Sequence, residues 1–94
     1  MDRSAELLAQ DLQSVLEGTV RLEMVLEDPR HQQGPLAACF HGLQHFLADE
    51  DIRAKDAGYW RMQEDEMRKL IRLLRADADD AKLRRITFLG AARA

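Results

Sequence analysis

Apolar positions recur along the first part of the chain at alternating intervals of four and three residues. The series is apolar except for one threonine and runs through Leu8, Leu12, Val15, Thr19, Leu22 and Leu26. This is the a/d spacing of a coiled-coil seam, which a helix presents on one face. Residues 4–28 are therefore predicted to form one long helix that ends before Pro29, because the residue before a proline is disfavoured in the helical conformation.

Gly18 lies inside this predicted helix, where glycine costs about 1 kcal/mol relative to alanine. It either permits the close approach of another helix or marks a bend. The apolar stripe is also wider than the seam itself, because Ala5, Ala9, Leu16 and Val20 lie beside it. One neighbouring helix would not cover this stripe, so a bundle or a dimer is required.

Two further helices follow from the same kind of spacing. Residues 35–48 carry an apolar face at intervals of four, three and four, and residues 57–76 combine an apolar face with a charged one. The segment 49–56 between them is short and charged, and Ile52 is its one apolar anchor. It is predicted to be a loop or a single helical turn.

The last predicted element is a short helix near the C-terminus. Asp79 and Asp80 are candidate N-caps, Leu83, Ile86 and Leu89 recur every three residues, and Gly90 can serve as a stop. The expected fold is a single all-α domain over residues 1–94, a small bundle of three to four helices with a long N-terminal helix. That helix is expected to pack along residues 57–76, with 35–48 closing the apolar face.

Composition agrees with a globular helical protein. The 94 residues are 46% hydrophobic and 33% charged, with only 2 prolines and 5 glycines, which is unlike a disordered segment. No stretch of 18 apolar residues and no signal-peptide pattern occurs, so no membrane association is expected. Arginine outnumbers lysine by 11 to 3, which suggests a GC-rich, bacterial source.

Cys39 is the only cysteine, which excludes an intramolecular disulfide and a cysteine-rich zinc module. A reducing compartment is the natural interpretation, and a cytoplasmic location is expected. Cys39 lies at the edge of an apolar stripe, and His41 points to a different side of the helix. A buried, inert cysteine is therefore favoured over a nucleophile.

His41 and His45 are the candidate metal ligands. They are four residues apart on one predicted helix, and Asp49 follows four residues later, so the three side chains could share a metal ion. Zinc requires three or four ligands, and the histidines lie opposite the apolar stripe, where solvated histidines are common. A solvated face is the favoured interpretation, and no cofactor is expected.

No pattern of reactive residues specifies an enzyme. Glu64, Asp65 and Glu66 form an acidic cluster, but Glu64–Arg68 and Asp65–Lys69 have the i,i+4 spacing of ion pairs on a solvated helix. Catalysis by paired carboxylates requires two different environments within a cleft, which nothing in the sequence indicates. No catalytic residue is predicted.

Charge is distributed unevenly along the chain. Residues 1–60 carry 5 basic and 11 acidic residues, whereas 61–94 carry 9 basic and 6 acidic residues. The basic half could contact nucleic acid or a DNA-binding partner as part of a small regulator. Interleaved acidic residues and the net charge of −3 make nucleic-acid binding the less favoured alternative.

The interpretation favoured by these patterns is a non-catalytic protein–protein interaction or adaptor module that forms a homodimer. A chain of this size gains stability by burying surplus apolar surface against a copy of itself. The predicted interface consists of Leu8, Leu12, Val15, Thr19, Leu22, Leu26 and Trp60. Trp60 is chosen as an anchor because it lies at one edge of an apolar stripe and should be only partly covered. A metal-binding or ligand-binding bundle remains the other alternative.

Overall fold

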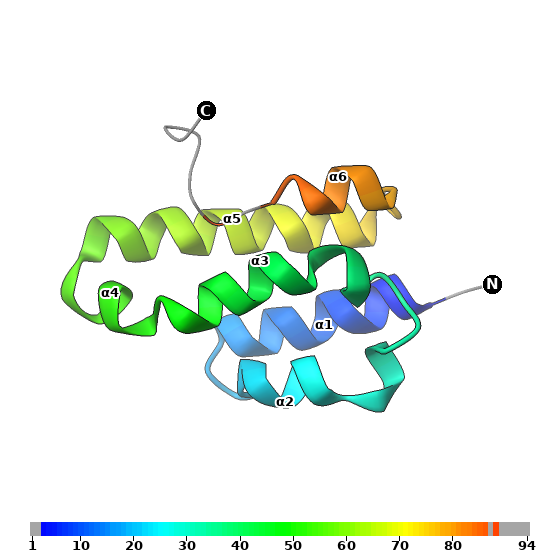
Figure 1. Cartoon of the computed structure of the whole chain (residues 1–94), viewed down its shortest axis with the longest axis horizontal. Coiled ribbons are helices and arrows are strands. Elements are labelled where there is room, and N and C mark those ends of the chain that lie inside the picture. The colour runs from blue at the N-terminus through cyan, green and yellow to red at the C-terminus, as the bar shows by residue number, and fades with distance from the viewer. Residues whose placement is uncertain (1–2, 87, 89–94) are drawn as a thin grey trace.

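The first and the longest helices make the most extensive helix–helix contact of the fold. A computed structural model describes residues 3–86 and 88, and every regular element in this part of the chain is a helix. α1 (Ser4–Leu16) packs along α5 (Ala57–Arg75), as predicted. The prediction of a small all-α bundle is therefore confirmed (Figure 1).

The predicted helix over residues 4–28 is two helices in the structure. α1 ends at Leu16, and α2 (Leu22–Glu27) follows a turn. α2 packs beside α1 instead of extending it (Figure 1). The prediction of one continuous helix was therefore wrong, although both ends of the segment are helical.

Gly18 accounts for the break. It adopts φ +79°, and the amides of Gly18 and Thr19 donate hydrogen bonds to the carbonyl oxygens of Val15 (3.1 Å) and Ser14 (3.0 Å). This pair of bonds is a Schellman motif, a C-terminal stop that requires a left-handed residue and favours glycine. Of the two interpretations of Gly18, the structure supports the bend.

The middle of the chain agrees closely with the prediction. A single 3-10 turn, η1 (Pro29–His31), precedes α3 (Leu36–Ala48), which matches the helix predicted over 35–48. The segment predicted as a loop or a single turn contains a short helix, α4 (Glu50–Lys55). Its burial pattern differs from the prediction, because Ile52 is exposed and does not anchor the segment.

α5 occupies nearly the whole of the predicted range 57–76. Asp56 caps it by accepting a hydrogen bond from the Tyr59 amide at 3.1 Å. A second Schellman motif ends α5, with Asp77 at φ +57°. The amide of Asp77 donates to the Leu74 carbonyl and that of Ala78 to the Leu73 carbonyl.

The last helix is shorter than predicted. α6 (Asp80–Arg84) begins after Asp79, whose side chain accepts a hydrogen bond from the Lys82 amide at 3.0 Å. Ile86 follows the helix and is buried, so the three-residue spacing of Leu83 and Ile86 does not reflect one continuous helix. Leu89 and Gly90 lie outside the described residues.

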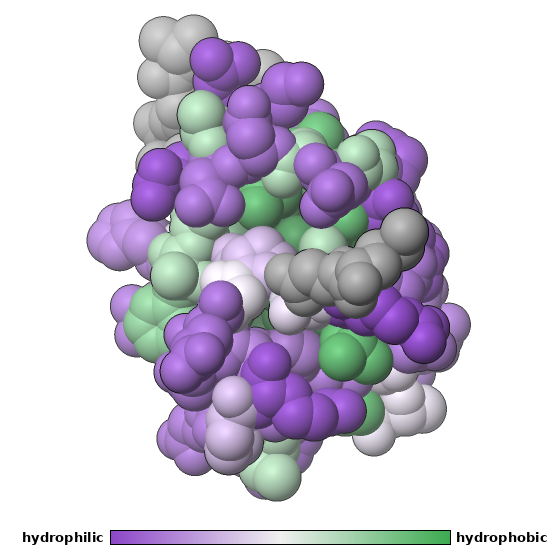
Figure 2. Space-filling model, turned by 90° about the vertical axis from the view of Figure 1, so that its right-hand side faces the viewer, coloured by the Kyte–Doolittle hydropathy of each residue, from purple (hydrophilic) through white to green (hydrophobic). Residues whose placement is uncertain are grey.

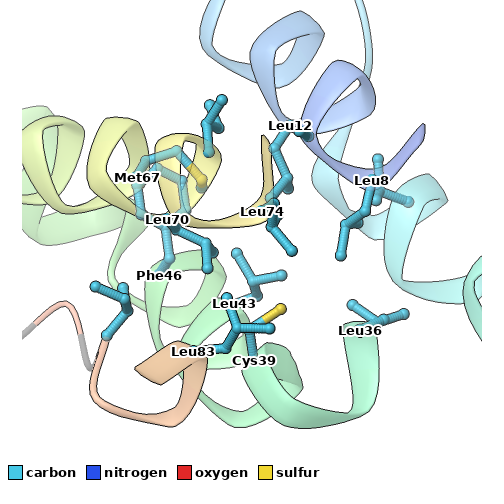
Figure 3. Close-up of a cluster of buried hydrophobic side chains, with 14 of the residues drawn as sticks. Leu8, Leu12, Leu36, Cys39, Leu43, Phe46, Met67, Leu70, Leu74 and Leu83 are labelled. Carbon is cyan, nitrogen blue, oxygen red and sulfur yellow. The ribbon is translucent and has the colours of Figure 1, made fainter. Parts of the chain in front are cut away.

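Five of the described helices contribute to the core, including α2 with the buried Leu22 and Val25. Figure 3 shows side chains of α1, α3, α5 and α6 converging on one cluster. Its labelled members are Leu8, Leu12, Leu36, Cys39, Leu43, Phe46, Met67, Leu70, Leu74 and Leu83. All are buried, so the apolar faces predicted for the separate helices meet in one interior.

Gly42 permits the segment after α6 to approach α3. A Cβ atom at this position would lie 2.6 Å from the Ile86 carbonyl oxygen, a distance at which one of the two backbones must shift. Beyond it, Phe88 is fully buried, and its ring lies 5.2 Å from that of Phe46 in an edge-on arrangement. Residues close to the C-terminus therefore complete the core.

The surface differs from the interior in the expected way. Figure 2 shows the end of the molecule where α1 begins, and most of its described residues are hydrophilic, with small separate apolar patches. Among the helices described here, none combines the length and the apolar character needed to cross a membrane.

Candidate functional site

The predicted interface seam lies mostly inside the folded chain. Leu8 and Leu12 are fully buried, and Leu22 is nearly so. Val15 and Leu26 are partly buried, and Thr19 is exposed. Leu8 and Leu12 therefore pack against the chain's own helices and offer no surface to a second copy. Any interface must use other residues.

A groove opens at the end of the molecule where α4 lies, and we call it the Trp60 groove. It has a volume of about 540 Å³. Its apolar lining is Val15, Leu16, Leu22, Phe46, Leu47, Ala54 and Trp60. Its charged lining is Arg21, Glu23, Glu50 and Arg53. The groove combines residues from α1 to α5, including the turn after Gly18, so no single helix defines it.

Trp60 contributes exposed apolar surface to this groove. Its exposed fraction is 37%, which confirms that it is only partly covered. Its ring lies 6.5 Å from that of Phe46. The Arg53 guanidinium carbon lies 3.9 Å from the Phe46 ring centroid and 5.7 Å from that of Trp60. These distances place the cation where the faces of both rings attract it.

Hydrogen bonds hold Arg53 in this position. Its Nη1 donates to the Phe46 carbonyl oxygen and, at 2.6 Å, to Oε1 of Gln63. Partial burial lowers the pKa of the Arg53 guanidinium, and the nearby carboxylates of Glu50 and Asp49 oppose that shift. An arginine remains charged in such surroundings. It therefore presents a fixed positive charge beside the aromatic rings.

Gln63 is the centre of a buried polar network beneath the groove. It is fully buried, and the two N–H groups of its Nε2 are shared among three acceptors: Asp49 (2.9 Å), the Tyr59 hydroxyl (3.2 Å) and the Phe88 carbonyl oxygen (3.2 Å). Gln63 was not among the residues predicted from the sequence. A signal was present, because residues 63, 67, 70 and 74 continue the apolar spacing of α5 and place a glutamine on its buried face.

The charged lining of the groove includes both signs. Arg21 and Glu23 form an ion pair at 3.2 Å, and their side chains remain largely exposed. Glu50 and Arg53 come from α4. Two positive and two negative groups therefore surround the apolar surface. A partner must present charges of both signs that complement them.

A second polar cluster lies where η1 meets α1 and consists of Asp11, Asp28, Arg30 and His31. Arg30 contacts Asp28 at 2.7 Å and Asp11 at 3.1 Å, and Nε2 of the buried His31 lies 2.7 Å from Asp11. Hydrogen bonds from Arg30 lower the pKa of Asp28 from 3.8 to about 2. This cluster was not predicted from the sequence either, because its members lie up to 20 residues apart.

The structure brings two of the three candidate metal ligands together. His41 and His45 face each other with their Nε2 atoms 3.2 Å apart. Asp49 instead accepts hydrogen bonds from the Tyr59 hydroxyl (2.6 Å) and Gln63. Within the described chain, only Asp11, Asp28 and His31 bring three potential ligand atoms within 4.8 Å of one another. Arg30 occupies the carboxylates of that group.

The other reactive candidates have structural surroundings. Cys39 is buried, as predicted, and burial raises the pKa of its thiol to about 12, which keeps it protonated near neutral pH. Glu64 forms the predicted pair with Arg68 at 2.8 Å, whereas Lys69 pairs with Glu66 at 3.9 Å instead of Asp65. These residues form the solvated face of α5.

The basic residues of the second half are partly neutralised. Besides the two pairs within α5, Arg75 reaches across to Glu6 of α1 at 3.3 Å. This contact joins α1 and α5, which pack along each other, at their surface. It also partly neutralises one of the basic residues that could contact a phosphate group.

Comparison with known proteins returns no relative. Neither a protein-family model, nor a curated protein, nor a solved structure matches this chain.

Proposed function

We propose that the chain is a non-catalytic protein–protein interaction module that forms a homodimer through the Trp60 groove. The observation that carries this proposal is a tryptophan left partly exposed over an apolar groove in a small domain. Tryptophan and arginine are the residues most enriched among those that dominate binding energy at interfaces. The groove contains both, with Trp60 and Arg53 already ordered by their neighbours.

Charge favours a second copy as the occupant. In a two-fold dimer the same patch meets itself, so each charged residue must find a partner of opposite sign within that patch. The Trp60 groove carries Arg21 and Arg53 together with Glu23 and Glu50. A patch of mixed charge meets this requirement, whereas a patch of one sign would repel its copy. Trp60 of each protomer would then lie in the groove of the other.

This proposal moves the interface away from the predicted helix seam. Of the residues predicted for the interface, only Val15, Leu22 and Trp60 line the groove. The absence of any intramolecular disulfide in a chain with one buried cysteine suits a reducing compartment, and we place this function in the cytoplasm. The nucleic-acid alternative has less support, because Arg68, Lys69 and Arg75 pair with acidic residues.

The mass of the protein in solution tests the proposal. Sedimentation equilibrium across the micromolar range should give a dimer for the natural chain and a monomer for Trp60→Ala, with helicity retained in both. Ile52→Ala is the matched control, because Ile52 is 48% exposed and lies outside the groove lining. This variant should remain dimeric.

A second variant separates loss of the interface from loss of the fold. Arg21 is highly exposed and forms its ion pair with the neighbouring Glu23, so Arg21→Glu should weaken the dimer without unfolding the chain. A natural chain that stays monomeric, or a dimer that survives both Trp60→Ala and Arg21→Glu, would refute the groove as the interface.

A further inference from the structure

His41 and His45 lie one turn apart on α3 and are both exposed. Their rings meet nearly at right angles, with centroids 4.6 Å apart, and their Nε2 atoms are separated by 3.2 Å. The two nitrogens are within hydrogen-bond distance of each other, so a metal ion that binds both would replace the proton they share. This geometry is independent of the Trp60 groove, because neither histidine lines it.

The separation of the two nitrogens matches the distance between two ligand atoms bound to one metal ion. Zinc–nitrogen bonds are about 2.0–2.1 Å, so two ligands at a tetrahedral angle lie about 3.3 Å apart. The observed separation is close to this value without any change of side-chain rotamer. Imidazole nitrogen is also a ligand that zinc, copper and nickel prefer.

The surroundings leave space on one side of the pair. A pocket of about 370 Å³ lies beside it, lined by Ala37, Ala38, Gly42, Arg84 and Ile86. Three of these residues are small, so water or another ligand can reach the remaining coordination positions. The positive charge of Arg84 opposes a bare cation but favours an anion bound to that cation.

We propose that His41 and His45 form a two-nitrogen chelate for a divalent metal ion of the zinc type, with its other positions open to solvent or to a small anion. This assignment uses only two of the three candidate ligands named from the sequence, because Asp49 is held by Tyr59 and Gln63. Two protein ligands define an exchangeable surface site and not a structural zinc centre.

Zinc chloride titration followed by calorimetry tests this site. The natural chain should bind one zinc ion. His41→Gln and His45→Gln should each weaken zinc binding by at least about tenfold, because even the loss of a residue that only hydrogen-bonds to a metal ligand lowers metal affinity by that much. Ring-nitrogen NMR spectra should show Nε2 of both histidines shifting with zinc, while the His31 signals stay unchanged.

A relocation variant provides the sharpest control. The double substitution His41→Gln with Gln44→His keeps three histidines in the chain but moves one to a position adjacent to His45, where two helical side chains do not face each other. It should bind as weakly as the single variants. The assignment is wrong if the natural chain gives no binding heat, if the relocation variant binds equally well, or if zinc shifts the His31 signals instead.

Discussion

The two polar clusters of this protein resemble each other in chemistry and differ in what covers them. At η1, Arg30 and His31 find their partners in Asp11 and Asp28. At the Trp60 groove, Arg53 likewise has its hydrogen bonds satisfied. No buried side-chain nitrogen or oxygen of the described residues lacks a partner. Satisfaction of polar groups therefore does not distinguish the two regions.

The kind of apolar surface left open does distinguish them. At η1 the buried His31 is 1% exposed, and the exposed apolar side chain beside the charged cluster is the unbranched, flexible Met24. At the groove, a large aromatic ring stays partly exposed above an apolar floor. Uncovered apolar surface bordered by polar groups is a mark of an interaction site. We therefore expect a partner at the groove, where a rigid aromatic ring and an ordered arginine lie together, and not at η1, where the exposed apolar side chain is a flexible methionine.

The largest effect on stability is expected at Gln63, beneath the groove. Gln63→Leu keeps the volume of the side chain but leaves buried hydrogen-bonding groups of Arg53, Asp49 and the Phe88 carbonyl with fewer partners. The free energy of unfolding should fall by about 3 kcal/mol, measured by urea denaturation. Gln10→Leu, at an exposed position, is the control and should change it by less than about 0.5 kcal/mol. Equal effects would remove Gln63 as the centre of the network.

A smaller loss is expected at the η1 cluster. Asp11→Ala removes the acceptor beside the buried Nε2 of His31, while Arg30 keeps its contact with Asp28. We expect a loss of about 2 kcal/mol in the free energy of unfolding. Asp65→Ala removes the same charge from an exposed position and should have little effect. If the two variants matched, the contact between Asp11 and His31 would contribute nothing measurable.

The smallest effect is expected at Gly18, whose turn brings Arg21 and Leu22 to the groove. A Cβ atom at this position would meet nothing within 4 Å, so Gly18→Ala costs only the left-handed backbone conformation. That cost is about 1 kcal/mol. Gly18→Asn should lose less than alanine, because asparagine tolerates this conformation better. A gain in stability and helicity on Gly18→Ala would mean that α1 and α2 can join into one helix.

The helices themselves could be predicted because their signals are local. The ranges 35–48 and 57–76 match α3 and α5 because apolar spacing, Asp56 as a cap and the charged opposite face all agree. The range 4–28 failed because the spacing of the seam continues across Gly18, so periodicity alone did not reveal the stop. The left-handed backbone conformation of Gly18 ends α1 although the apolar spacing of the side chains continues.

The candidate site could be predicted only in part. Trp60 was expected to be partly exposed from its place at the edge of a stripe, and it is. Arg53 and Gln63 were missed, because their roles depend on Phe46, Asp49 and Phe88, which lie on other elements. The same reason explains why Asp49 was wrongly grouped with the histidines. Helical spacing brings it near them in projection, whereas packing against α5 gives it other partners.

The class of fold, the main helices and the apolar face of each helix follow from local patterns, because they depend on residues within a few positions of one another. Which of these apolar faces are covered follows from the packing of the helices. It buried Leu8 and Leu12 within the chain and left Trp60 beside an open groove. The physical reason is that coverage depends on contacts between segments far apart in the chain, and helical periodicity carries no information about which segments meet.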